Sequence, residues 1–135
     1  MPPRPRLYFD GGCRPAGMET AVVLRGVAYL TDDLGPGASM DAEWQALIAA
    51  VRLAQAHGVV DPVFLGDSRA VIAQATGTAK ARGPALDYRE TFRALTAGMP
   101  LHVRYVRRSQ NLAGIALDRR HDGSVRQPFP CVPSS

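Results

Sequence analysis

The sequence has almost no lysine, although its net charge is positive. Lys80 is the only lysine among the 16 basic residues of a chain whose net charge is +4. One interpretation is a genome whose base composition favours arginine codons. The other is a phosphate-binding surface, because a guanidinium group pairs with phosphate through two hydrogen bonds. The charge favours a nucleic-acid partner only mildly, but it argues against a strongly cationic substrate.

Cysteine and long apolar runs are also scarce. Cys13 and Cys131 lie far apart and are too few for a disulfide framework or a zinc site. No apolar run reaches the roughly 18 residues that a membrane helix needs. The N-terminus, Met-Pro-Pro-Arg-Pro-Arg, has no signal-peptide core. We therefore expect a cytoplasmic protein without a membrane segment, and nothing in the sequence indicates an obligate protein partner.

The length and composition are those of one ordinary globular domain. The chain has 135 residues, of which 46% are hydrophobic and 21% are charged. We expect a single domain over residues 1–135, with a core from about 6 to 120. Residues 121–135 are rich in proline and serine and are predicted to form an irregular tail.

The hydrophobic pattern predicts three strands, a helix, a strand, two helices, a strand and a final helix. The predicted strands cover residues 6–10, 20–24, 27–30, 59–67 and 101–106, and the predicted helices cover 39–57, 68–74, 84–97 and 109–120. Gly11-Gly12 is expected to break the first strand, and Ser109 to cap the last helix. A hairpin meander followed by β–α alternation predicts an α/β fold with a mixed five-stranded sheet flanked by helices.

Three acidic residues border apolar segments in different parts of the chain. Asp10 follows Leu-Tyr-Phe, Asp67 follows Val-Phe-Leu-Gly, and Glu43 comes directly before a tryptophan. Burying an unpaired charge is expensive, so acids beside core-forming residues need an explanation. Two of them end strands, where ligand sites form in α/β sheets. If the fold gathers all three, a hard cation such as Mg²⁺ or Mn²⁺ would balance their repulsion.

Each acid also has a simpler interpretation. Asp10 could stabilise a turn with the two glycines that follow it. Asp67 could cap the next helix, and Glu43 could interact with the positive end of its own helix. Taken singly, these interpretations are as good as a metal site. Taken together they are weaker, because the predicted fold places all three acids near one edge of the sheet.

Four segments of the chain resemble motifs of the type 1 ribonuclease H family. Residues 7–12, Leu-Tyr-Phe-Asp-Gly-Gly, are similar to its first strand, and residues 42–47, Ala-Glu-Trp-Gln-Ala-Leu, to its Ala-Glu helix. Residues 65–68, Leu-Gly-Asp-Ser, resemble the strand-ending Asp-Ser motif. Residues 103–111 resemble the strand that leads to the last acidic helix. The order also agrees, and the resemblance covers about residues 7–120.

The resemblance implies a ribonuclease H-like fold and a metal-dependent endoribonuclease. Such an enzyme cuts the RNA strand of an RNA–DNA hybrid and leaves a 5′-phosphate. By position, Asp10, Glu43 and Asp67 would be catalytic residues that hold two Mg²⁺ ions, with Mn²⁺ as a substitute and Asp10 as the bridging ligand. In the family, one ion activates water and the other stabilises the leaving 3′-oxygen.

The fourth acid of the family is missing from its expected place. The family pattern is Asn-x-x-Ala-Asp-x-Leu-Ala, but residues 111–118 read Asn-Leu-Ala-Gly-Ile-Ala-Leu-Asp. Depending on the alignment, Gly114 or Ile115 stands where the acid should be. Asp118 is the candidate substitute as a catalytic and metal-binding residue, because it lies about one turn (~5.4 Å) beyond Gly114 on the same helix face. Alternatively, Asp118 is a surface acid that pairs with a nearby arginine, Arg119, Arg120 or Arg126.

The resemblance also implies which residues contact the substrate. The predicted substrate-binding residues are Gly11, Gly12, Cys13, Arg14, Met40 and Asn111. The segment from Gly12 to Gly17 is compressed and lacks the family's usual Asn, and residues 38–40 replace its Thr and Asn. Recognition of the 2′-hydroxyl distinguishes RNA from DNA, so these changes affect hybrid specificity.

The basic helical insertion of many bacterial members is absent. The segment from Gly77 to Gly83 is too short for it, which predicts weak and strongly salt-dependent binding. Two alternatives to a hybrid-specific enzyme therefore stay open. One is a related nuclease with a different nucleic-acid preference, and the other is a non-catalytic nucleic-acid-binding module. Trp44 and Tyr105 are expected in the core, and His121 in solvent.

Overall fold

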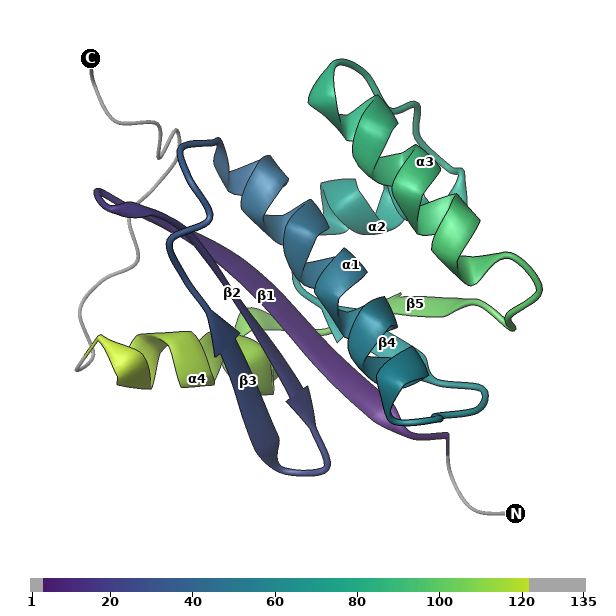
Figure 1. The fold of residues 1–135 in the computed structure, drawn as a ribbon, viewed down its shortest axis with the longest axis horizontal. Coiled ribbons are helices and arrows are strands. Elements are labelled where there is room, and N and C mark those ends of the chain that lie inside the picture. The colour runs from purple at the N-terminus through teal and green to yellow at the C-terminus, as the bar shows by residue number, and fades with distance from the viewer. Residues whose placement is uncertain (1–3, 122–135) are drawn as a thin grey trace.

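A five-stranded mixed sheet forms the centre of the computed structural model, which describes residues 4–121 (Figure 1). The strands are β1 (Arg6–Arg14), β2 (Gly17–Leu24), β3 (Val27–Thr31), β4 (Val63–Gly66) and β5 (His102–Tyr105). Their order across the sheet is β3-β2-β1-β4-β5. The first three strands form an antiparallel meander, whereas β4 runs parallel to both β1 and β5. The predicted α/β fold and the mixed five-stranded sheet are confirmed.

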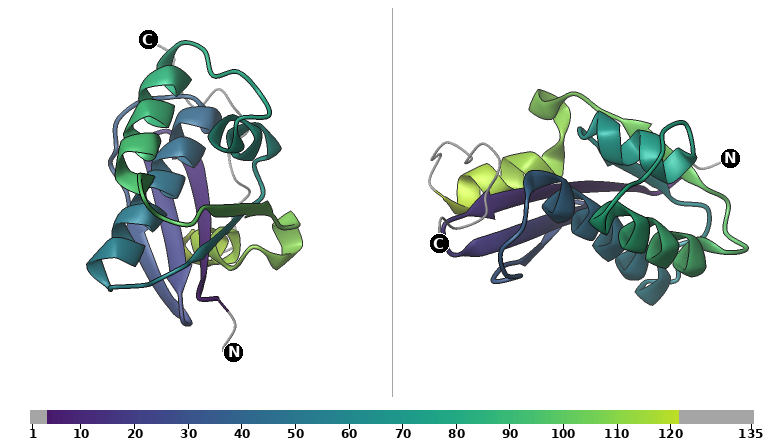
Figure 2. Two further views of the ribbon diagram at one scale, coloured as in Figure 1. Left: turned by 90° about the vertical axis from the view of Figure 1, so that its right-hand side faces the viewer. Right: turned by 90° about the horizontal axis from the view of Figure 1, so that it is seen from above.

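Helices cover both faces of this sheet. They are α1 (Ser39–Ala56), α2 (Arg69–Thr76), α3 (Pro84–Thr96) and α4 (Leu112–Arg120), with a short 3₁₀ helix, η1 (Arg108–Gln110), before α4. Helix α1 packs on β1 and β2, and α3 packs against α1. Helix α4 lies across the opposite face of the same two strands (Figure 2). No helix of the described segment has the length and apolarity to span a membrane.

The larger apolar core lies between the sheet and α1. Phe9 and Phe64 from the strands and Trp44 from α1 are fully buried in it, and the Trp44 ring stacks on Tyr88 of α3. A smaller core joins α4 to the other face of the sheet, where Leu117 is buried against β2. Burial of these side chains fixes α1 and α4 against β1 from both sides, so that β1 becomes the central strand.

Gly11 allows α1 to approach β1 closely. A Cβ atom at this position would lie 2.1 Å from the carbonyl oxygen of Ala42 and 2.5 Å from the backbone nitrogen of Glu43. Both atoms belong to the backbone of a helix, so neither can move away cheaply. The absence of a side chain at Gly11 therefore brings the first turns of α1 onto the strand.

Several predicted boundaries were wrong, and the reasons are local. The glycines at 11 and 12 do not break the first strand, because β1 continues to Arg14 and pairs with β2 over its whole second half. Ser109 lies in η1, and the residue that caps α4 is Asn111. Helix α2 ends at Gly77 as expected, in the left-handed conformation with φ 86°. The tail predicted for residues 121–135 falls outside the described residues except for His121.

Replacement of Gly11 by alanine is expected to destabilise the protein by about 2–3 kcal/mol, because the added methyl group overpacks a rigid backbone contact. Gly58→Ala is the matched control. Gly58 follows α1 with a φ of 64° and has open space around its Cα, so it should lose only roughly 1–2 kcal/mol from backbone strain. Urea denaturation measures both values, and a smaller loss for Gly11→Ala than for Gly58→Ala would refute the packing argument.

Candidate functional site

The parallel pairing of β1 with β4 places two aspartates side by side. Tyr8 pairs with Leu65 at the last matched position of the two strands. Asp10 lies two residues further along β1, and Asp67 lies two residues further on, just after the end of β4, where their carboxylates come together. Asp10 is fully buried. The two aspartates that follow apolar segments in the sequence therefore lie at one location in the fold.

Glu43 reaches these aspartates from the first turns of α1. Its Oε1 accepts a hydrogen bond of 2.7 Å from the backbone N–H of Gly11, the residue after Asp10. The helix start is satisfied without Glu43, since the Asp41 carboxylate accepts from the Ala38 N–H at 2.7 Å. The simpler interpretation of Glu43, as an acid at the positive end of its helix, therefore does not account for its position.

The structure brings Asp10, Glu43 and Asp67 into one cluster. One carboxylate oxygen from each residue lies within 4.8 Å of the others. The simpler interpretation of Asp67 as a helix cap does not hold, because Ser68 caps α2 and its Oγ accepts from the Val71 N–H at 3.3 Å. Three carboxylates this close fit the hard-oxygen coordination of Mg²⁺ or Mn²⁺.

The pKa of Glu43 is raised well above its ordinary value of 4.5. Burial is the main cause, because it disfavours the charged carboxylate, and the negative charge of Asp10 adds to the effect. The Gly11 N–H opposes the increase by stabilising the carboxylate form. A bound cation would favour that charged form and would offset the repulsion between the carboxylates.

Asn111 connects the cluster to α4. Its side-chain oxygen accepts from the Ala113 N–H at 3.1 Å and so caps α4. Its side-chain nitrogen donates to the Phe9 carbonyl at 3.1 Å and to Oδ2 of Asp67 at 3.3 Å. One fully buried amide therefore fixes the start of α4, the strand before Asp10 and the orientation of Asp67.

Asp118 does not belong to the cluster of three acids. It lies in the last turn of α4 and is half-buried. Among the described residues it forms no ion pair, and Arg120 instead pairs with Asp32. Arg126, the third arginine considered as a partner, lies outside the described residues.

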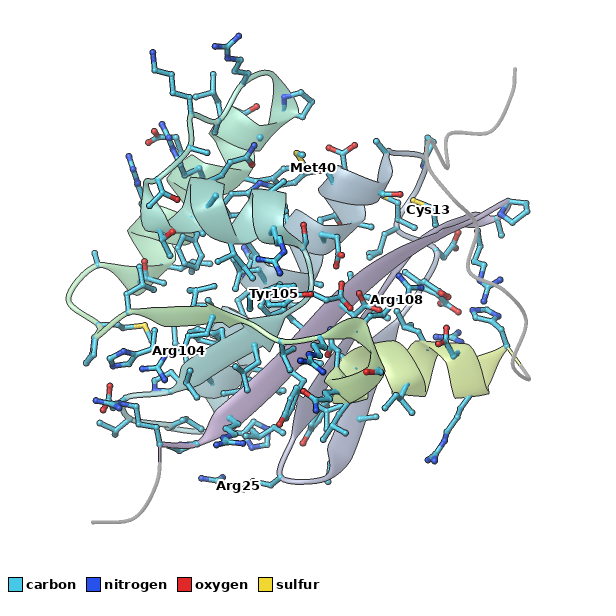
Figure 3. All side chains as sticks on the ribbon, turned by 180° about the vertical axis from the view of Figure 1, so that it is seen from behind. Cys13, Arg25, Met40, Arg104, Tyr105 and Arg108 are labelled. Carbon is cyan, nitrogen blue, oxygen red and sulfur yellow. The ribbon has the colours of Figure 1, made fainter. Side chains whose placement is uncertain are left out.

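The other predicted substrate-binding residues lie in the second half of β1 and at the start of α1. Gly12 and Cys13 are buried in the second half of β1, and the Arg14 Nε lies 3.5 Å from Oε2 of Glu19. Met40 is 39% exposed at the start of α1 (Figure 3). The geometry therefore leaves Met40 open to a ligand, whereas Arg14 is engaged with an acid of its own protein.

Two features beside the site were missed from the sequence. Glu19 is a buried acid on β2, and Nε2 of His121 lies 2.6 Å from its Oε1. The expectation of a solvent-exposed His121 was wrong. Tyr105 is 41% exposed rather than part of the core, and the Arg69 guanidinium lies 3.8 Å from the centre of its ring. A glutamate inside an apolar strand was the available signal for Glu19, whereas nothing in the sequence indicated the pairing with His121.

Comparison with known proteins identifies the family. A family profile described as "Reverse transcriptase-like" matches residues 26–121. The structure of a type 1 ribonuclease H from the halophilic archaeon Halobacterium salinarum superposes with a TM-score of 0.77 at 30% identity, covering 89% of this chain and 99% of that one. The chain belongs to the ribonuclease H family. A search of the curated proteins found no match.

Two further ribonuclease H structures share the fold. The N-terminal ribonuclease H domain of a Mycobacterium tuberculosis protein, solved as a fusion with maltose-binding protein, has a TM-score of 0.71 and 23% identity over 85% of this chain and 95% of that one. The LC11 type 1 ribonuclease H, solved with an RNA/DNA hybrid, has a TM-score of 0.70 and 22% identity over 87% and 99%. The profile match starts at residue 26, so Asp10 enters the family comparison only through the structures.

The metal-free protein is expected to lose stability as the pH rises above 4.5, the ordinary pKa of a glutamate. Because the pKa of Glu43 is raised in the folded state, the folded state binds more protons than the unfolded state in this range, and stability falls with pH. Urea unfolding in the presence of chelator measures the effect. Glu43→Gln should flatten the fall, whereas Glu90→Gln, an exposed glutamate on α3, should not. Equal pH profiles for all three proteins would contradict the prediction.

Asn111→Ala is expected to lower the free energy of unfolding by about 2 kcal/mol. The helix cap contributes about 1 kcal/mol, and loss of the buried donor to the Phe9 carbonyl costs a comparable amount. Ser68→Ala removes a cap only and should cost about 1 kcal/mol. Thermal or urea denaturation compares the two, and equal losses would show that the additional bonds of Asn111 contribute nothing.

Proposed function

We propose that this protein is a metal-dependent endoribonuclease that hydrolyses the RNA strand of RNA–DNA hybrids. The observation that carries the proposal is the convergence of Asp10, Glu43 and Asp67 within 4.8 Å on a ribonuclease H fold. A charge cluster of this kind is costly for a protein that only binds nucleic acid, because it needs an ion to compensate it. A catalytic role would explain why the protein keeps a cluster that costs stability.

The three carboxylates would hold two Mg²⁺ ions, with Mn²⁺ as the substitute. Bound ions at this position supply activation of the attacking water and stabilisation of the leaving oxygen. The protein contributes the fixed positions of the ligands. The Gly11 N–H orients Glu43, and the Asn111 amide orients Asp67, so that neither side chain has to be ordered when the substrate binds.

The substrate proposal is supported by the relatives. The LC11 ribonuclease H, whose fold this chain shares, was solved with an RNA/DNA hybrid. Met40 is exposed at the start of α1, and Gly11 and Gly12 add no side chain beside Asp10. We propose these residues, with Cys13, Arg14 and Asn111, as the part of the site that contacts the substrate. Asp118 is proposed as the substitute for the family's fourth acid, with a catalytic and metal-binding role.

The proposal predicts metal-dependent cutting of the RNA strand in a labelled hybrid. Asp10→Asn should reduce the rate at least about a hundredfold, because metal-ion catalysis is worth several kcal/mol of transition-state stabilisation. Asp87→Asn, which removes an exposed carboxylate on α3, should leave the rate unchanged. The measurement is a cleavage assay with Mg²⁺, Mn²⁺ or chelator.

The same assay tests the alternatives. Cutting of duplex RNA or of DNA would indicate a nuclease of the same fold with a different preference. Binding without any cutting would favour a nucleic-acid-binding module and reject the enzyme. Asp118→Asn tests the fourth acid: an unchanged rate would reject its role, whereas a lower rate with unaltered stability would support it.

A further inference from the structure

A hollow lined by arginines lies on the α4 side of the sheet, on the half of that face that α4 does not cover. Its volume is about 550 Å³. Its walls come from β1, β4, β5 and η1 and include Arg4, Arg6, Tyr8, Leu65, Arg104 and Gln110. Figure 3 shows Arg104 on the β5 side of the sheet, away from α4. We refer to this hollow as the arginine groove.

The positive charges of the arginine groove are available to a ligand. Arg6 and Arg104 are exposed, and neither forms an ion pair with any carboxylate within residues 4–121. Among the arginines that line the groove, only Arg4 has an acidic partner, Asp61, at 2.8 Å. Two free guanidinium groups on neighbouring parts of one surface are suited to successive phosphates, since each can bind a phosphate through two hydrogen bonds.

The arginine groove and the acidic cluster share one face of the sheet. Side chains of a strand alternate between faces, so Arg6, Tyr8 and Asp10 all point to the same side. Asp67 lies just after β4, two residues beyond Leu65 of the groove, and its carboxylate lies in the cluster with Asp10. Arg6 lies four residues before Asp10, which is about 13 Å along the strand at roughly 3.3 Å per residue. A nucleic-acid strand that extends from the acidic cluster along β1 would therefore reach the arginine groove.

We propose that the arginine groove binds a single-stranded segment of nucleic acid that extends from the acidic site. Arg6 and Arg104 contact its phosphates, and the half-buried ring of Tyr8 stacks against a base. Arginines combined with an aromatic side chain on an open surface are the usual features of single-strand binding. A hollow in the small-molecule range of roughly 300–1,000 Å³ accommodates splayed bases rather than the width of a duplex.

This inference rests on the proposed function for the path of the strand, but its test does not need catalysis. We would measure binding of a labelled single-stranded DNA of about 12 nucleotides, within the usual site sizes of roughly 4–16, by fluorescence anisotropy in chelator. The double variant Arg6→Ala, Arg104→Ala should bind more weakly. The slope of log affinity against log salt should become shallower by about 1.4, since each lost phosphate contact changes it by roughly 0.7.

The matched control is the double variant Arg52→Ala, Arg93→Ala. Both arginines are exposed on α1 and α3, on the other side of the sheet, and their removal changes the net charge by the same amount. This variant should keep the parent affinity and salt slope. Tyr8→Leu, which retains an apolar side chain in the α4 core, should weaken binding about 5- to 150-fold through loss of one stacked base. Circular dichroism verifies that each variant is folded.

The outcomes separate this inference from the proposed function. Equal affinities and equal salt slopes for the two double variants would refute single-strand binding at the arginine groove, even if hybrids are cut. Competition by blunt duplex DNA as strong as that by single-stranded DNA would refute it as well. Conversely, if binding depends on the groove but the protein cuts no substrate, the groove would be supported and the proposed enzymatic function would be rejected. If hybrids are cut, the Arg6→Ala, Arg104→Ala variant should raise the KM for hybrids with a single-stranded extension more than the KM for blunt hybrids.

Discussion

The close contact between β1 and α1 at Gly11 is the constraint on which the site depends. A backbone N–H of the strand can reach a carboxylate of the helix only because no side chain separates the two elements. The same contact sets how far Glu43 lies from Asp10, since Gly11 is the residue next to Asp10 in sequence. The packing of α1 on β1 therefore also determines the geometry of the site, because a change that separates the helix from the strand moves Glu43 away from Asp10.

The second constraint is electrostatic and works against the fold. Without a cation, three carboxylates within 4.8 Å repel one another, and burial makes the repulsion stronger. Burial, and then the negative charge of Asp10, raise the pKa of Glu43, so the charged form of this carboxyl group is disfavoured in the folded protein. The hydrogen bonds from Gly11 and Asn111 keep the carboxylates in place despite the repulsion. The site is thus held rigid at some expense in stability, as is common for functional sites.

Much of the fold and the central acids could be predicted from the sequence, because both follow from short-range patterns. Apolar segments that end in an acid mark the first half of β1 and the whole of β4, and the helical spacing around Trp44 marks α1. What could not be predicted depends on contacts distant in sequence. The pairing of His121 with Glu19 joins residues 102 positions apart, and the stacking of Arg69 on Tyr105 depends on how α2 packs against β5. Gly11 misled the prediction because its role is to admit a helix rather than to end a strand.

The register between β1 and β4 also determines where the chain can change in length. Asp10 and Asp67 face the same side because each follows the Tyr8–Leu65 pair by two residues. Inserting or deleting one residue within either segment would turn its aspartate to the opposite face, where α1 packs. The segment between α1 and β4 can change in length, because a longer segment leaves the spacings from Tyr8 to Asp10 and from Leu65 to Asp67 unchanged. Among related chains, we therefore expect insertions to accumulate in the connections and to be excluded from the two residues that precede each aspartate.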